Sequence, residues 1–256
     1  MPETAKPVQL APHTLAAFDN YIRESEFAME PSLTGDQPFL WSDLKTELSQ
    51  RIREGRAVAE LWSSPGPLHI ADGLIHDWIG ATFIPDATVN ATLAMVQDYD
   101  HHQNIYKPEV IDSRLLTREG NDFHIHLRLL KKKVITVVLD TFHDVHYSQL
   151  SPARWTLRSF TSRIQEVEHA GTKKETVMPP DTGHGFLWRL NTYWKFEERD
   201  HGTWLECRAT SLTRDIPKGL AWIIDPIIRK LPRESLIHTL EATRKVLAPS
   251  PQPVGL

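Results

Sequence analysis

The order of secondary-structure signals along this chain constrains its fold more than any other feature. One strand-like apolar run, residues 74–84, is followed by a helical stretch, six more strand-like runs and a final helical segment, residues 218–247. Strands joined by tight turns pair antiparallel, and a sheet with an apolar face needs a helix to cover it. The order therefore predicts an α+β protein. We expect a curved, seven-stranded antiparallel sheet wrapped on a long C-terminal helix, with two short helices after the first strand.

Composition limits the classes of function. The chain has 256 residues, of which 40% are hydrophobic and 24% charged, as is typical of a globular protein with one large core. Its formal net charge of -4 does not supply the positive field that nucleic-acid binding requires. No stretch reaches the roughly 20 apolar residues that span a bilayer, and residues 1–10 do not resemble a signal peptide. We expect a cytoplasmic protein with no transmembrane segment and no nucleic-acid partner, and the sequence indicates no particular protein partner.

The first third of the chain predicts an extension ahead of the sheet. One helix is expected from Thr14 to about Met29, where Pro31 follows and ends it, and a second helix is expected to start near Ser42. A Ser-Ser-Pro-Gly-Pro turn cluster at 63–67 then separates the extension from the strands. The predicted division is residues 1–66 as a helical extension, 67–248 as the main domain and 249–256 as a flexible tail.

The final helical segment contains two prolines. Pro226 and Pro232 each remove a backbone donor within residues 218–247. The segment is therefore predicted to kink or to divide into two consecutive helices.

Alternation in the run 135–147 places polar side chains on an otherwise apolar face. Thr141, His143 and Tyr147 share this face with valines and leucines. On a face that lines a cavity, the imidazole and the phenol would hydrogen-bond a ligand oxygen or transfer a proton. The alternative interpretation is that this end of the strand simply reaches solvent.

Further candidates come from other strands and from the final helix. Arg189, with Glu206 and Arg208 on neighbouring runs, would anchor a carboxylate or phenolate, or would form solvated ion pairs. Cys207 is the only cysteine, which excludes an internal disulfide, and its position favours a small strand residue over a nucleophile. Trp222 would stack on an aromatic ligand or pack in the core. The predicted ligand-binding residues are Thr141, His143, Tyr147, Arg189, Thr192, Cys207 and Trp222.

Neither a metal site nor a cofactor is predicted. His124 and His126 lie two residues apart on one strand face, but no third ligand is identifiable. The sequence also contains no Gly-x-Ser-x-Gly elbow, no His-Glu-x-x-His helix and no phosphate-binding glycine loop. No motif therefore identifies catalytic residues.

The chain resembles the START-related lipid-transfer superfamily, which includes birch-pollen-allergen-like proteins and bacterial polyketide cyclases. The likeness lies in the strand, two helices, six strands, helix order, and it covers residues 74–247. It is also seen where the short helices lead into the second strand, in Met95-Val96-Gln97-Asp98-Tyr99-Asp100 and Tyr106-Lys107-Pro108-Glu109-Val110.

The resemblance implies a helix-grip fold that binds or carries a hydrophobic small molecule in a cavity between sheet and helix. A lipid, a polyketide or an aromatic compound would fit such a cavity. Two alternatives stay open, because one fold supports several functions. One is a cyclase-like or aromatase-like enzyme acting on such a ligand, and the other is an interaction module with a vestigial cavity.

Overall fold

The computed structural model describes residues 6–62, 65–132, 136–215 and 221–248, with the backbone alone for 221–229. Seven long strands carry the architecture. They are β4 Gly73–Pro85, β5 Val110–Glu119, β6 Asp122–Lys132, β7 Thr136–Ser151, β8 Arg154–Glu168, β11 Arg189–Arg199 and β12 Gly202–Arg214. The short strands are β1 Val8–Gln9, β2 Val58–Leu61, β3 Leu68–Ile70, β9 Thr176–Val177 and β10 Thr182–Gly183.

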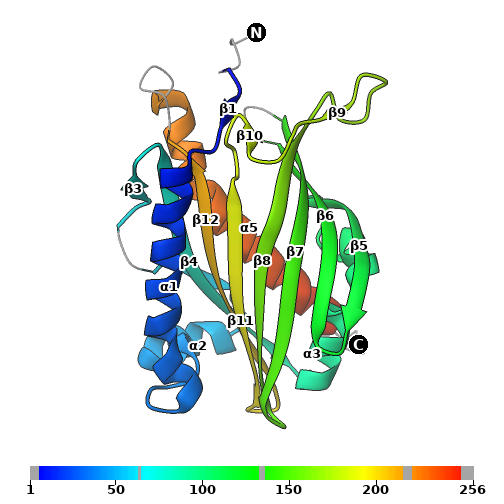
Figure 1. Ribbon diagram of the computed structural model, residues 1–256. Helices are drawn as coiled ribbons and strands as arrows, with labels where there is room; N and C mark the ends of the chain where they lie inside the picture. The colour runs from blue at the N-terminus through cyan, green and yellow to red at the C-terminus, as the bar shows by residue number, and fades with distance from the viewer. Residues whose placement is uncertain (1–5, 63–64, 133–135, 216–220, 249–256) are drawn as a thin grey trace.

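The helices fall into three groups. The chain before the sheet forms α1 Pro12–Thr34, the 3-10 helix η1 Trp41–Leu44 and α2 Thr46–Arg53. After β4 come α3 Val89–Val96, the 3-10 helix η2 Tyr99–His101 and α4 His102–Ile105. The last element is α5 Ala221–Leu247. A curved antiparallel sheet thus grips one long C-terminal helix, and the predicted helix-grip fold is confirmed (Figure 1).

The sheet is larger than the seven strands predicted. Within the described residues it has ten strands in the order β2-β4-β12-β11-β8-β7-β6-β5, with β3 also paired to β4 and β9 paired to β8. The additional strands are two to four residues long, and the antiparallel ladder along the edge of β4 is formed by β2 and then β3. Segments of two or three residues, such as β9 and β3, carry too little alternation to be recognised from sequence.

The prolines within helices do not end them. Helix α1 continues through Pro31 to Thr34 and stops at Gly35, whose φ of 96° is the left-handed conformation that glycine tolerates. Likewise α5 is one helix and not two, although it contains Pro226 and Pro232. The prediction that Pro31 ends the first helix is therefore wrong. A proline removes one hydrogen bond, and that loss is smaller than the packing that both helices gain over many residues.

Different helices cover the two faces of the sheet. On the concave face, α3 and the C-terminal half of α5 pack against β4, β12 and β11 (Figure 1). On the convex face, α1, η1 and α2 cover the same strands, and the convex face of β5 to β8 lies beyond them. Because β2 precedes residue 66 and pairs with β4, the N-terminal segment contributes to the sheet. The domain boundaries themselves stay predictions, and residues 249–256 lie outside the described part of the chain.

The helix and the sheet approach most closely at Gly80. A Cβ atom at this position would lie 2.9 Å from Leu240 Cδ1 and 3.1 Å from Leu236 Cδ2. Since only glycine leaves room for these leucines, Gly80 sets how near the C-terminal half of α5 comes to β4.

Candidate ligand-binding site on the concave face

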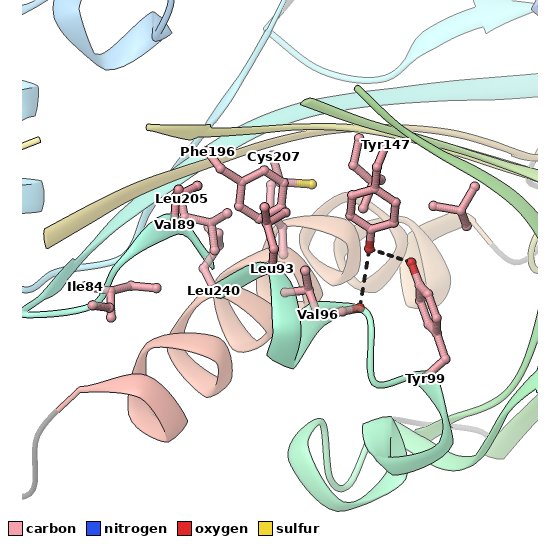
Figure 2. Close-up of a cluster of buried hydrophobic side chains, with 14 of the residues drawn as sticks. Ile84, Val89, Leu93, Val96, Tyr99, Tyr147, Phe196, Leu205, Cys207 and Leu240 are labelled. Atoms are coloured by element: carbon pink, nitrogen blue, oxygen red, sulfur yellow. Dashed lines mark hydrogen bonds between the residues drawn. The ribbon is translucent and has the colours of Figure 1, made fainter. Parts of the chain in front are cut away.

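The lower half of the concave face, which is the half nearer the hairpin between β11 and β12 in Figure 1, is an apolar core. Figure 2 shows side chains from β4, α3, β11, β12 and α5 meeting there. Its labelled aliphatic and phenyl members, all buried, are Ile84, Val89, Leu93, Val96, Phe196, Leu205 and Leu240. This half of the face is mainly apolar and holds α5 on the sheet, although the buried Thr82 Oγ1 and Trp155 Nε1 have no hydrogen-bond partner in the described residues.

Tyr147 belongs to this core and its hydroxyl is already engaged. It donates to the carbonyl of Val96 at 3.4 Å, so the 2.7 Å contact with Tyr99 is one in which Tyr99 donates (Figure 2). Burial is the main cause that raises the pKa of both phenols. In this arrangement Tyr147 fixes the loop after α3 to the sheet.

His143 is also on the concave face, and hydrogen bonds define its tautomer. Thr141 Oγ1 donates to the carbonyl of Leu127 at 3.0 Å, and a hydroxyl has one proton. The 2.9 Å contact between His143 and Thr141 therefore runs from Nε2–H to Oγ1, and Nδ1 accepts from the Ser159 hydroxyl at 3.3 Å. Burial lowers the pKa of His143 to about 4. His143 is thus a neutral imidazole with both nitrogens bonded.

The low pKa of His143 makes a prediction about acid stability. An unfolded histidine with the usual pKa of 6.5 binds a proton that folded His143 does not bind until about pH 4. Stability from this group is therefore complete above pH 6.5 and is lost as the pH falls towards 4. For His143→Gln we expect the loss in unfolding free energy between pH 6.5 and 4.5 to be smaller by about 2 kcal/mol. Urea unfolding across this range measures it.

The matched control is His146→Gln, on the exposed side of the same strand. It removes an imidazole whose bond to Asp122 lies at the surface, so a comparable change in this variant would show that the effect does not depend on burial. Equal pH slopes for His143→Gln and the unsubstituted protein would contradict the assignment of His143 as a buried neutral group.

The upper half of the concave face differs from the lower half because its polar groups are small and numerous. Strand register places Ser159 opposite Thr192, Thr192 opposite Ala209, and Ala209 opposite Trp78. The next row contains His143, Thr161, Leu190, Ser211 and His76. Hydroxyl groups therefore line the centre of the sheet where it faces the N-terminal half of α5.

Exposure along the central strand β11 distinguishes its two faces. Asn191 and Tyr193 point to the convex side and are buried, whereas Leu190, Thr192 and Trp194 point to the concave side and are partly exposed. Ala209, beside Thr192 on β12, is also partly exposed. Residues in the middle of a ten-stranded sheet keep accessible surface only where neighbouring atoms do not fill the adjacent space.

The structure brings together five of the seven predicted residues. Thr141, His143, Tyr147, Thr192 and Cys207 all lie on the concave face. Cys207 is 1% exposed, and burial raises the pKa of its thiol. Their roles towards a ligand stay predictions.

The other two predicted residues are not placed with these five. Arg189 is paired with Leu212 on the convex face and bonds Asp181 Oδ1 at 2.6 Å. Trp222 is outside the residues whose side chains are described.

The proposed partners of Arg189 also lie on the convex face. Arg208 binds Asp77 through Nε at 3.0 Å and Nη2 at 2.5 Å, beneath α1. Glu206 accepts the backbone N–H of Trp41 at 2.7 Å, and burial raises its pKa to about 7. These groups attach the N-terminal helices to the sheet and do not form an anchor with Arg189.

A depression lies on the uncovered part of the convex face. It has a volume of about 360 Å³ and is centred on Phe142, where the register between β7 and β8 shifts by a bulge. Arg163 lies over the Phe142 ring at 3.8 Å, and His124 bonds Asp144 at 2.7 Å. Among the described residues, no group of three or more His, Cys, Asp or Glu side chains is arranged to hold a metal ion.

Sequence reasoning missed Ser159, Thr161 and Ser211. The signal was present in β8, where Leu157, Ser159 and Thr161 alternate with exposed or partly exposed residues. Small hydroxyl residues are common on exposed strand faces, so their burial becomes evident only when α5 is placed over them.

No helix in the described residues is long and apolar enough to cross a membrane.

Comparison with known proteins places this fold among solved structures. No protein-family model and no curated protein matches the chain. One similar structure is TTHA0849 from Thermus thermophilus, at 15% identity over 66% of this chain and 94% of that one, with a TM-score of 0.48. Another is a STAR-related lipid transfer protein from Xanthomonas axonopodis, at 16% identity over 73% of this chain and 99% of that one, with a TM-score of 0.46.

A third similar structure is the Zhui aromatase/cyclase from Streptomyces sp. R1128. It is 12% identical over 68% of this chain and 93% of that chain, with a TM-score of 0.45. At these identities and TM-scores, the helix-grip assignment rests on the strand order and the placement of α5 described above.

Proposed function

We propose that this protein binds a hydrophobic small molecule between the upper half of the concave face and the N-terminal half of α5. The molecule would replace the solvent that now contacts Leu190, Thr192, Trp194 and Ala209. Burial of apolar area contributes roughly 25 cal/mol per Å², so a ligand of lipid or polycyclic size binds without any charged contact.

The observation that supports this proposal is that side chains in the middle of β11 are partly exposed on the concave face but buried on the convex face. A strand covered by helices on both faces is expected to be buried on both. In the middle of β11, Asn191 and Tyr193 on the face under α1 are buried, whereas Thr192 and its neighbours on the face towards α5 keep accessible surface. Incomplete filling of a concave face is what a container requires, and a structural core does not need it.

No observation favours catalysis over binding. His143 uses both ring nitrogens within the protein, and the Tyr147 hydroxyl donates to Val96. Neither side chain has a free proton to donate, and the basic lone pair on His143 Nδ1 already accepts from Ser159.

A space-filling substitution tests the proposal. Ala209→Phe would place a phenyl ring in the space above Thr192. We expect the variant to bind the neutral dye Nile red at least about 10-fold more weakly, because the ring excludes the dye, while its thermal unfolding midpoint falls only slightly. Fluorescence titration and calorimetry on the purified full chain measure the two quantities.

Two results would contradict this proposal. One is a failure of the unsubstituted protein, after denaturing extraction and refolding, to bind Nile red while also yielding no co-purified apolar compound. The other is a large loss of stability in Ala209→Phe, which is expected if the space is already filled. Thr210→Val, on the opposite face of the same strand, serves as the control.

A further inference from the structure

The hydroxyl groups on the upper concave face are arranged as hydrogen-bond donors towards a ligand. Thr161 Oγ1 accepts the backbone N–H of Leu190 at 2.9 Å, and Thr192 Oγ1 accepts Trp194 Nε1–H at 3.2 Å. Each hydroxyl therefore uses an acceptor position within the protein and keeps its own proton for donation. Ser211, one strand away, adds a third hydroxyl that bonds to no other described residue.

The same region of the sheet carries His76 and the neutral His143, but no carboxylate, ammonium or guanidinium group among its described residues. Across the two rows that contain Thr192 and Ser211, the inward-facing described residues include no Asp, Glu, Lys or Arg. Described charged groups on this side of the sheet lie at its margins, where Glu166 accepts three backbone N–H groups from residues 184–186 and Lys131 pairs with Glu109. An anion placed among the hydroxyls would lose its hydration without gaining a counter-charge from the sheet.

We infer that the site selects an uncharged apolar molecule that carries an acceptor oxygen, such as a ketone, ester or ether, and that Thr192 and Ser211 donate to this oxygen. This inference rests on the proposed function and specifies its ligand class. A ligand that displaces the solvent leaves the protons of the Thr192 and Ser211 hydroxyls without an acceptor among the described residues, unless the ligand itself supplies an oxygen that accepts them. A hydrocarbon fills the space but accepts no hydrogen bond from the hydroxyls. A carboxylate accepts these hydrogen bonds but loses the hydration of its charge.

Three fluorescent compounds with one ring system provide the test. Pyrene, 1-acetylpyrene and 1-pyrenecarboxylate differ only in the group presented to the hydroxyls. At pH 8 we expect the unsubstituted protein to bind the ketone about 5- to 10-fold more tightly than pyrene, as one or two buried hydrogen bonds predict, and to bind the carboxylate most weakly.

The double variant Thr192→Val with Ser211→Ala removes both donors and keeps nearly the same shape. We expect the ratio of ketone to pyrene affinity to fall to about 1 in this variant, because the ketone loses its hydrogen bonds. Thr210→Val is the matched control, since its buried hydroxyl faces the convex side and has no hydrogen-bond partner in the described residues. It is expected to retain the ratio.

The outcomes separate the two proposals. If none of the three compounds binds, the proposed function fails. If pyrene binds and the ketone gains nothing, or if the carboxylate binds most tightly, the container stands and the inference about an uncharged acceptor ligand is overturned. The relative affinities of the three compounds are measured first on the unsubstituted protein. A folding defect in the double variant therefore does not prevent these affinities from testing the inference.

Discussion

Replacing Arg208 with methionine is expected to destabilise the protein by about 3–5 kcal/mol, because it leaves the Asp77 carboxylate buried without its guanidinium partner. The two side chains are each 4% exposed and are joined by two hydrogen bonds. Arg208 also donates to Ser25 at 3.0 Å, and Tyr21 donates to Asp77 at 2.7 Å, so the pair joins α1 to β12 and β4. Denaturant unfolding of the full chain measures the loss.

A double variant distinguishes a broken pair from lost packing. Arg208→Met with Asp77→Leu removes both charges, and we expect it to recover more than half of the stability lost in the single variant. An unfolding free energy within about 1 kcal/mol of the original for Arg208→Met alone would show that the pair contributes little.

Truncating Leu240 is the second change with a large expected effect. This residue of α5 is 0% exposed and lies against Gly80, where helix and sheet are closest. Leu240→Ala is expected to cost about 2–5 kcal/mol, because the rigid contact with β4 cannot collapse around the missing atoms. The same denaturant experiment reports it.

Val246→Ala provides the control within the same helix. Val246 is 53% exposed, so its truncation is expected to change the unfolding free energy by less than about 0.5 kcal/mol. Similar losses for the two variants would indicate that helix propensity, and not the contact with the sheet, determines the stability of α5.

The assignment of side chains to the correct face illustrates how far sequence reasoning reached. In β7 the alternation was clear, since Asp144 and His146 are exposed and His143, Val145 and Tyr147 are buried. In β12 nearly every residue is buried, because helices cover both faces. Alternation in burial then disappears, and the sequence does not indicate that Glu206 and Arg208 pack beneath the N-terminal helices and not beside a ligand.

The sequence by itself determined the order of the long elements. Strand alternation, turn residues between strands and the amphipathic last helix are local properties, and they are enough to predict a sheet that grips α5. Tertiary structure alone decided which buried polar groups attach the N-terminal helices and which line the concave face. That choice depends on register across β4, β12, β11 and β8 and on what covers each face. The pairing of β12 with β4 and the bonds from Arg208 to Asp77 and Ser25 join residues more than 100 positions apart, so local sequence does not reveal them.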